Sequence, residues 1–542
     1  MIEFENVLPR FRNGEKFCGQ YNNPEMVLPC HLSINDYKLG EFLHRLHNTV
    51  ADDRRLLFIQ GKVIPCCHNW IRDHVHMMKA FMHYEYRLKD FLDYIISTQR
   101  EQGYYLELVK QITDAHHTFV GEEHRTIYEE DSVAATRLEL EADVEYLVVE
   151  GVMLYYKATG DFEWVKKVLP SLEKAINYMT SDPKRWNKEL GLVIRPFTID
   201  TWDFVGTRPS TNRRIIDGEQ MSAMHGDNSG VYDAMKILEF FNAKNGDDNK
   251  AKEWSERAET LRKNAIRYLF NGKFFIHQYH INHSGNDNKE SERLSISNAY
   301  DINRNFTTTE QSRSIINEYM ERRKNTKAFA EWFTIDPPYE KFGKLSAGQY
   351  VNGGITPFVA GEIALAAFNN GYEEYGWDII TRCAEMMERD GCLKFVYSPD
   401  YKESNSTQGP GGWGCAGLIN AIDKGLAGIN DVDCLYREID FSPRFTVTHY
   451  TEMRYITGYE ISDRYVDVRF IIKDYGMRYD LISQAEKINA HILLPKDKDC
   501  KKLLVNGKEH SFSVSVIGES KYVDFNVVSC SKLSIEIEFE RK

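Results

Sequence analysis

The chain has 542 residues, 42% of them hydrophobic and 13% aromatic, which is enough for a sizeable core in several domains or in one large domain with an appendage. Its 81 acidic and 68 basic side chains give a formal charge of −13, which argues against nucleic acid or an anionic membrane as the main partner and favours a neutral substrate. The first twenty residues show no signal peptide, and no stretch approaches the roughly 20 apolar residues that span a bilayer. We therefore expect a cytoplasmic protein, although a processed secreted form would look the same.

The cysteine pattern and the glycine pattern both argue against a bound metal or cofactor. Ten cysteines occur without a CxxC pair or any metal-like spacing, which predicts reduced, buried thiols. No HExxH motif is present, no GxGxxG follows a strand, and GPGGWG lacks the lysine of a phosphate loop. We expect neither a metal site nor a cofactor.

The N-terminal third begins with a cover segment and continues into helices. Residues 1–69 mix short apolar runs with Pro and Gly, which predicts irregular structure or a few strands. From residue 72 to 99 the apolar residues recur every three or four positions, which predicts one long helix or two in sequence. A helix from about 139 to 159 ends at Gly160-Asp161, and the segment after it begins an antiparallel partner.

Helical hairpins continue to about residue 430. The pattern predicts helices at 229–241, 249–269, 308–322, 355–369, 372–389 and 415–426. Turns within a pair are short, whereas the segments between pairs are longer and carry unusual residues. Hairpins in this number, without a regular sequence repeat, predict a closed toroid over residues 70–438 whose long loops converge at one end.

Residues 439–542 have a different texture. Period-two alternation, as in YVDVRFIIKDY and SKLSIEIEFE, is separated by turn signals such as VNGKE. This pattern predicts a C-terminal β-sandwich that covers the helical domain.

The segment GLVIRPFTIDTWDFVGTR, residues 191–208, is the strongest candidate for chemistry. It places Asp200 and Asp203 on either side of Trp202, and Pro196 prevents it from being helical throughout. A carbohydrate site needs a flat apolar face for a sugar ring, one carboxyl to hold hydroxyl groups and another to move a proton. Burial against the aromatic residues, or the charge of Asp200, would keep Asp203 protonated near neutral pH.

Three further segments are candidates for substrate binding. In HNWIRDHV, Trp70, Arg72 and Asp73 lie at a helix start, where adjacent Arg and Asp side chains favour a charge-assisted bond or Asp73 acts as a cap. In GQYVNGG, Gln349, Tyr350 and Asn352 can bind hydroxyl groups, and the glycines allow close approach of the backbone or a tight turn. Trp413 in GGWG can stack on a sugar or close the barrel.

The order of these motifs resembles the six-hairpin glycosidases, the glucoamylases, trehalases and processing α-glucosidases. A W-x-R-D helix start, a D-x-W-acid loop, an NGG segment and an acid before an aromatic GWG helix start follow one another in both. The resemblance implies an (α/α)6 barrel, Asp203 as the general acid, and Asp73 as a ligand of sugar hydroxyls where the bond is cut.

The second carboxylate departs from those relatives. They carry a Glu two residues before an aromatic, whereas YSPDYKESNSTQGPGGWG has Pro399 in that place. Asp400 and Glu403 are the nearest acids, and either could activate water in an inverting mechanism. Should both lie far from Asp203, the substitutes are Glu219, Glu331 and Glu362.

The sequence therefore predicts a glycoside hydrolase acting on a carbohydrate, without specifying the sugar, the anomer or the linkage. Histidines are abundant in the first third, among them His74, His76 and His83. They keep open a sugar epimerase or a polysaccharide lyase on the same barrel, and the displaced base keeps open a non-catalytic carbohydrate-binding protein.

Overall fold

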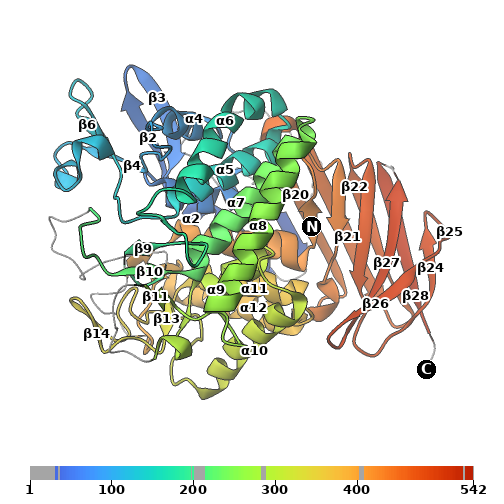
Figure 1. Ribbon diagram of the computed structural model, residues 1–542. Coiled ribbons are helices and arrows are strands. Elements are labelled where there is room, and N and C mark those ends of the chain that lie inside the picture. Colours follow the sequence, from blue (N-terminus) through green and yellow to red (C-terminus); the bar gives the residue numbers. More distant parts are fainter. Residues whose placement is uncertain are drawn as a thin grey trace.

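The computed structural model describes residues 31–34, 37–196, 198–200, 214–281, 289–401, 408–528 and 531–540. A helical body is followed by a β domain, which lies on the right in Figure 1. The helices of the body are α2 (Tyr37–Asp52), α3 (Ile71–Phe81), α4 (Asp90–Ser97), α5 (Val144–Thr159), α6 (Phe162–Met179), α7 (His225–Lys244), α8 (Asp248–Leu269), α9 (Ser297–Asn303), α10 (Thr309–Asn325), α11 (Pro357–Asn369), α12 (Glu373–Asp390) and α13 (Gly412–Asn420).

Six of the described helices contact one another in a closed cycle. Helix α3 contacts α5, and the cycle continues through α7, α9, α11 and α13 back to α3. The even-numbered helices pack outside this inner set: α4 on α5, α6 on α5 and α7, α8 on α7, α10 on α9 and α11, and α12 on α11. Helix α2 closes the outer set against α3, α12 and α13.

Burial explains which helices are inner. Every residue of α11 from Pro357 to Phe368 is buried, so this helix has no polar face to turn toward water. By contrast, α8 buries six residues along one stripe and exposes charged residues elsewhere. Helices α11 and α13 approach closely at Gly361, which has no side chain. A Cβ at this position would lie only 2.5 Å from the carbonyl carbon of Gly417, so a larger residue would force the two helices apart.

The helix boundaries differ from the sequence predictions in four places. Residues 37–52 form α2 rather than irregular cover, and α9 occupies a segment that we expected to be a loop. The helix expected from about 139 begins at Val144, whereas residues 72–99 form two helices in sequence, α3 and α4, which is one of the two predicted alternatives. Helix α13 ends at Asn420 and continues as a π-helix, η5 (Ala421–Leu426).

The β domain consists of two sheets. One contains β1 (His31–Ile34), β20 (Glu452–Tyr459), β21 (Arg464–Lys473), β22 (Gly476–Ser483), β28 (Lys532–Phe539), β24 (Cys500–Val505) and β25 (Lys508–Glu509), in that order. The other contains β18 (Ile429–Asp431), β19 (Glu438–Phe441), β23 (Lys487–Leu493), β27 (Ser520–Val528) and β26 (Ser513–Ile517). The sheets pack on each other through ring contacts such as Phe441 with Tyr479, 5.7 Å between centroids. The first of these strands along the chain, β1, lies near the N-terminus and pairs antiparallel with β20, so the β domain draws on both ends of the chain.

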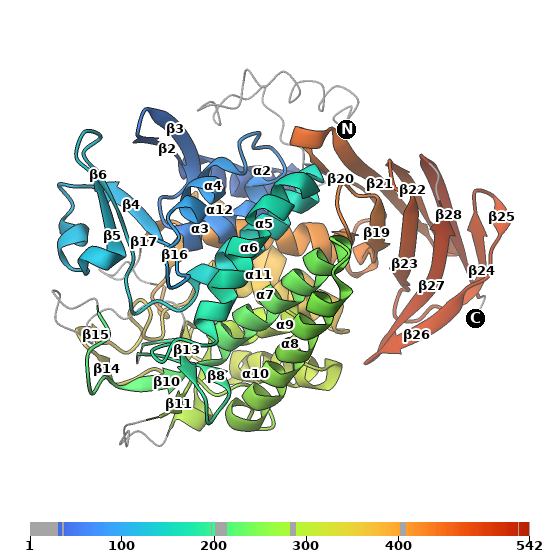
Figure 2. The same cartoon turned by 45° about the horizontal axis from the view of Figure 1, so that its top comes forward.

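The helical body lies between the β domain and a set of short sheets. Figures 1 and 2 both show the short sheets on the side of the body away from the β domain. They include β4 (Leu108–Gln111) with β5 (Arg125–Tyr128) and β6 (Val133–Thr136), and β9 (Arg195–Pro196) with β10 (Met221–Ala223) and β11 (Tyr279–His280). None of the described helices is long and apolar enough to cross a bilayer.

Candidate active site

The inner helices begin at the same end of the body. Arg72, in the first turn of α3, bonds to Asp143, the N-cap residue of α5. The imidazole Nε2 of His225, the first residue of α7, lies 2.9 Å from Oγ of Ser295, two residues before α9. Phe358 of α11 stacks on Trp413 of α13. Several partly positive helix N-termini therefore gather at one end, which favours acidic side chains there.

Arg72 joins the starts of α3 and α5 and is buried. Its Nη2 donates to Oδ1 of Asp143 and to Oε2 of Glu141, both at 2.8 Å, and its Nε also donates to Asp143. Burial raises the pKa of Asp143, but the Arg72 charge outweighs burial and the pKa is lowered. The expected bond between Arg72 and its neighbour Asp73 is thus replaced by a pair of acids from another loop.

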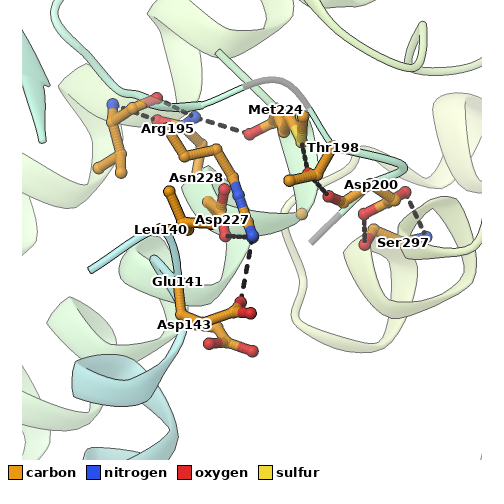
Figure 3. A network of polar contacts seen from close by, with 12 residues as sticks. Leu140, Glu141, Asp143, Arg195, Thr198, Asp200, Met224, Asp227, Asn228 and Ser297 are labelled. Carbon is orange, nitrogen blue, oxygen red and sulfur yellow. Dashed lines mark hydrogen bonds and ion pairs between the residues drawn. The ribbon is translucent and has the colours of Figure 1, made fainter. Parts of the chain in front are cut away.

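Arg195 extends this network toward α7 (Figure 3). Its Nη2 donates to the same Glu141 oxygen at 3.1 Å, and its Nη1 lies 3.6 Å from Oδ1 of Asp227. Asp227 is fully buried and accepts no hydrogen bond from a described residue. Burial raises its pKa to about 7, although Arg195 opposes that shift. The network therefore contains a carboxyl that can hold a proton near neutral pH.

Asp200 is enclosed by protein partners. Its carboxylate accepts from the main-chain N–H of Ser297 at 3.1 Å and from Ser297 Oγ at 2.5 Å, and none of the residue is exposed (Figure 3). Burial raises the pKa of Asp200, but His225 and the hydroxyls of Ser295 and Ser297 outweigh burial and lower it. Asp200 is charged, as we expected, but its contacts fix the loop to α9 and leave its carboxylate no surface for a sugar hydroxyl.

His225 lies between two acids. Its Nδ1 lies 2.5 Å from Oδ2 of Asp301 and its Nε2 lies 3.7 Å from Oδ2 of Asp200. Burial lowers the pKa of His225, whereas Asp301 and Asp200 raise it. Their effect is larger than that of burial, so the net shift of the pKa is upward. A protonated His225 stabilises the ionised form of Asp200 in this fully buried site.

A second histidine holds the backbone of Asp200. The main-chain N–H of Asp200 donates to Nε2 of His277 at 2.8 Å, at a positive φ of 51°. Because Nε2 accepts, the proton of a neutral His277 sits on Nδ1, which donates to Oε2 of Glu290 at 2.8 Å. Tyr339 donates to the other Glu290 oxygen at 2.6 Å. This chain of bonds fixes the point at which the backbone enters residues 201–213.

Asp203 and Trp202 lie outside the described residues, as does Glu403. Asp400 is described: it is exposed, and its Oδ1 accepts from Ser398 Oγ at 2.7 Å. Of the substitutes, Glu331 is buried and bound by Arg382 and Tyr375, and Glu362 is bound by Lys79. Glu219 is half-buried. Ion pairs thus occupy two of the three substitute acids.

Trp70 and Asp73 remain accessible at the end where the helices begin. Both are half-buried, and the Asp73 carboxylate lies 3.7 Å from Nδ1 of His68. The ammonium of Lys110 lies 5.8 Å from the centre of the Trp70 ring. An accessible aromatic ring beside an accessible carboxylate is suitable for holding a sugar.

The GQYVNGG segment is built around Asn352. This residue is fully buried, accepts from the main-chain N–H of Tyr339 and donates to the carbonyl of Tyr339, both at 2.9 Å. It therefore shapes a loop, and the prediction that it contacts substrate is corrected. Gly353 has a φ of 95°, so a turn explains this glycine. Gln349 and Tyr350 are half-buried and keep partial access to solvent.

Trp413 belongs to the core. It is 7% exposed, and its ring lies between His76 at 4.2 Å and Phe358 at 4.7 Å, nearly parallel to both. Its Nε1 donates to the Tyr300 hydroxyl at 2.9 Å. With both faces of the ring covered, Trp413 closes the inner set of helices and cannot stack on a sugar.

Three described histidines of the first third, His74, His76 and His83, have separate structural contacts. His74 accepts from the main-chain N–H of Cys67, His83 bonds to the carbonyl of Gly458, and His76 is stacked on Trp413. These positions give no support to the epimerase alternative. Among the described residues there is no group of three or more His, Cys, Asp or Glu side chains that could hold a metal ion.

His225, Asp227, His277 and Glu290 belong to the site but were not predicted from the sequence. A signal existed for two of them, since MHGDNSG places a histidine and an acid at the start of α7. His277 and Glu290 lie in short irregular segments whose partners are distant in sequence, and no local pattern indicates them.

No family model matches the sequence, and no curated protein matches it. Solved structures do share the fold. The α-L-rhamnosidase of Dictyoglumus thermophilum superposes with a TM-score of 0.62 at 11% identity over 94% of this chain and 50% of its own. A GH78 family rhamnosidase of Bacillus sp. GL1 gives 0.58 at 12% identity, over 86% of this chain and 43% of its own. For the Streptomyces avermitilis α-L-rhamnosidase complexed with L-rhamnose, the TM-score is 0.58 at 10% identity, over 94% of this chain and 42% of its own.

This chain therefore spans about half the length of these three structures or less. The chain therefore shares its fold with solved glycoside hydrolases, in agreement with the motif resemblance. At identities of 10–12% this likeness concerns the fold alone.

Proposed function

We propose that this chain is a glycoside hydrolase, that its cycle of inner and outer helices is an (α/α)6 toroid, and that its active site lies where the inner helices begin. One observation carries the proposal: the loop that leads into Trp202 and Asp203 is fixed at Asp200 by buried bonds from three sides. Such bonding places the start of a loop accurately, which is what catalytic residues require. Trp70 and Asp73 are accessible at the same end.

The roles follow from the chemistry of glycoside cleavage. Asp203 protonates the leaving oxygen, and a second carboxylate, Asp400 or Glu403, directs water to the opposite face with inversion. Trp202 and Trp70 offer aromatic faces to the sugar, and Asp73, Gln349 and Tyr350 bind its hydroxyl groups. Arg72, Asp200, Asn352 and Trp413 position the site from within the protein and do not touch the substrate.

The substrate is a carbohydrate, and the fold likeness to α-L-rhamnosidases makes a terminal α-L-rhamnoside the first to test. We assign the chemistry to the helical body and a covering role to the β domain, because the short sheets lie on the side of the body away from that domain (Figures 1 and 2).

The decisive experiment is a screen of aryl α- and β-glycosides of several sugars with the purified protein. Release of the aryl alcohol from one of them, with the first-formed anomer identified by NMR, establishes hydrolysis and its stereochemical course. An inverted anomer supports water activation by a second carboxylate, whereas retention requires a covalent intermediate on that residue. Sugar binding without turnover across the panel would contradict the proposal and favour a carbohydrate-binding protein.

A further inference from the structure

A cavity of about 720 Å³ lies at the opposite end of the helical body, where the inner helices end against the β domain. It is lined by the later parts of α3, α5, α7, α9 and α11, by η5, and by residues of β18 and β19. A volume of this size is within the range of about 300–1,000 Å³ that is typical of small-molecule sites.

Tyr300 separates this cavity from the candidate active site. Its hydroxyl accepts from the Trp413 indole, which belongs to the layer at the helix starts. The ammonium of Lys79, a lining residue, lies 5.4 Å from the centre of the same ring. The two sites thus lie on different sides of one aromatic layer, and ligand binding in the cavity is independent of the proposed glycosidase activity.

Basic side chains predominate over acidic ones in the lining. The basic residues are Lys79, Lys157, Lys236, Arg304, Lys424 and Arg444, and the acidic ones are Glu150, Asp233, Glu362 and Asp440. Some of the charges are already paired: Lys79 lies 2.9 Å from Glu362 and 3.7 Å from Glu150. The excess of positive charge in a confined space favours an anion.

Lys424 is the cation that lacks a partner. It is half-buried, lines the cavity, and makes no hydrogen bond or ion pair with a described residue. Burial and repulsion by Lys157 lower its pKa to about 8, although Asp423 and Glu150 oppose the shift. It also lies on the π-helix η5, and π-helical turns occur frequently at functional sites. A cavity-lining lysine that no described residue binds points to a ligand.

Hydroxyl and amide groups complete the lining. Thr307, Thr309, Asn305 and Asn430 contribute polar side chains, whereas apolar side chains such as Ile237 and Phe240 are fewer. Such a lining matches a ligand with several hydroxyl groups better than an apolar one.

We infer that this cavity binds a small polyhydroxylated anion, of the sugar-acid or sugar-phosphate class, with its anionic group on Lys424. Sugar acids and sugar phosphates both carry a negative charge on a hydroxyl-bearing carbon chain. They differ in the charge and shape of the acidic group, which is a carboxylate in one and a phosphate in the other. Lys157 and Lys79 add positive potential, since both are near enough to repel Lys424.

The test uses the full chain with four probes: gluconate, glucose 6-phosphate, neutral glucose, and sodium sulfate at matched ionic strength. We expect gluconate or glucose 6-phosphate to raise Tm by about 2 °C or more at saturation, and glucose and sulfate to have no such effect. Calorimetry then gives the Kd of gluconate and of glucose 6-phosphate. The tighter of the two shows whether the site prefers a carboxylate or a phosphate. No shift with either, or an equal shift with glucose or sulfate, overturns the inference.

Variants locate the binding site. Lys424→Met should weaken binding of the sugar anion at least about tenfold, since a charge-assisted bond is lost, and should raise Tm without ligand. Asp233→Asn removes a carboxyl whose ionised form repels an anion in the cavity, so it should tighten binding at pH 8, above the Asp233 pKa of about 7 that burial produces. Lys252→Met on α8, at a side chain that is 77% exposed, is the matched control and should change neither. Unaltered affinity in Lys424→Met, or weaker affinity in Asp233→Asn, would contradict the assignment.

Discussion

The main-chain N–H of Asp200 donates a 2.8 Å hydrogen bond to Nε2 of His277, 77 positions further along the chain. This bond holds a residue at a positive φ of 51°, a conformation that side chains other than glycine and Asn or Asp seldom adopt. It also determines that Nδ1 of His277 faces Glu290 with its proton. The geometry of the catalytic loop in our proposal thus depends on residues that do not touch the substrate.

Replacing Asp203 tests the general acid. If Asp203 protonates the leaving oxygen, Asp203→Asn should lower kcat by a factor on the order of 10² to 10⁴ toward glycosides with poor leaving groups. Glycosides with strongly acidic aryl alcohols need less protonation and should be affected less. Asp217→Asn, an exposed acid in the same region of the chain, is the matched control. Equal turnover by Asp203→Asn and wild type on a poor leaving group would remove Asp203 from this role.

Glu290 should stabilise the fold at neutral pH and lose this stabilising effect at acid pH. Burial raises its pKa, but His277 and Tyr339 outweigh burial and hold the pKa at about 2, below the ordinary 4.5. A carboxyl with a depressed pKa stabilises the fold above pH 4.5, and that stabilisation is lost as the pH falls from 4.5 toward 2. Glu290→Gln should therefore lower the free energy of unfolding at pH 7 by on the order of 2–3 kcal/mol.

The measurement for Glu290→Gln is denaturant unfolding at pH 7 and at pH 3, compared with wild type. The difference between the two proteins should shrink at the lower pH, and turnover should fall at pH 7 because the Asp200 loop is less well held. A difference that grows toward pH 3 would have the wrong sign for this linkage.

Asp227 should have the opposite pH dependence. Its pKa is raised to about 7 by burial, above the ordinary 3.8. A raised carboxyl pKa means that ionisation opposes folding, so the penalty is absent below pH 3.8, grows between 3.8 and 7, and is complete above 7. Asp227→Asn should therefore raise Tm at pH 8 and leave it nearly unchanged at pH 4. A lower Tm at pH 8 would instead mean that the Arg195 ion pair is worth more than the burial penalty.

Trp413 and Trp70 should respond differently to substitution. Trp413→Phe loses the bond to Tyr300 and part of its packing, so it should destabilise the protein by about 1–3 kcal/mol while KM stays unchanged. Trp70→Ala removes an accessible ring and should raise KM with little effect on Tm. Thermal melts and Michaelis kinetics on both variants separate the two roles. A raised KM in Trp413→Phe would return that residue to the binding site.

Local sequence patterns predicted most of the helices because an amphipathic helix carries its burial pattern in its own residues. The same signal was present in α2, where Leu39, Phe42, Leu43, Leu46 and Val50 recur at helical spacing and are all buried. Helix α9 was different, since six of its seven residues are buried and no polar face alternates with an apolar one. No periodicity distinguishes such a segment from a buried loop.

The sequence predicted which segments form the candidate site, but not which side chains within it contact one another. The sequence indicated that the segments with Asp73, Asp200 and Asn352 carry unusual residues, and the structure links two of them through His277 and Tyr339. It could not indicate that Arg72 pairs with Asp143 rather than with Asp73, because that choice depends on which loop lies opposite a helix start. For the same reason it misjudged Asn352 and Trp413, whose residue types suit a sugar site but whose surroundings are closed.

The sequence by itself determined the helical hairpins and the change to strands near residue 439, and it brings Asp200, Trp202 and Asp203 together in one short segment. These features depend on local propensity, periodicity and the backbone limits of proline and glycine, which each segment carries with it. The tertiary structure alone decided which charges are paired, which aromatic rings are covered, and that β1 joins a sheet formed mainly by the C-terminal residues. Burial and electrostatics are properties of neighbours in space, and neighbours such as Asp200 and Ser297 are 97 positions apart in the chain.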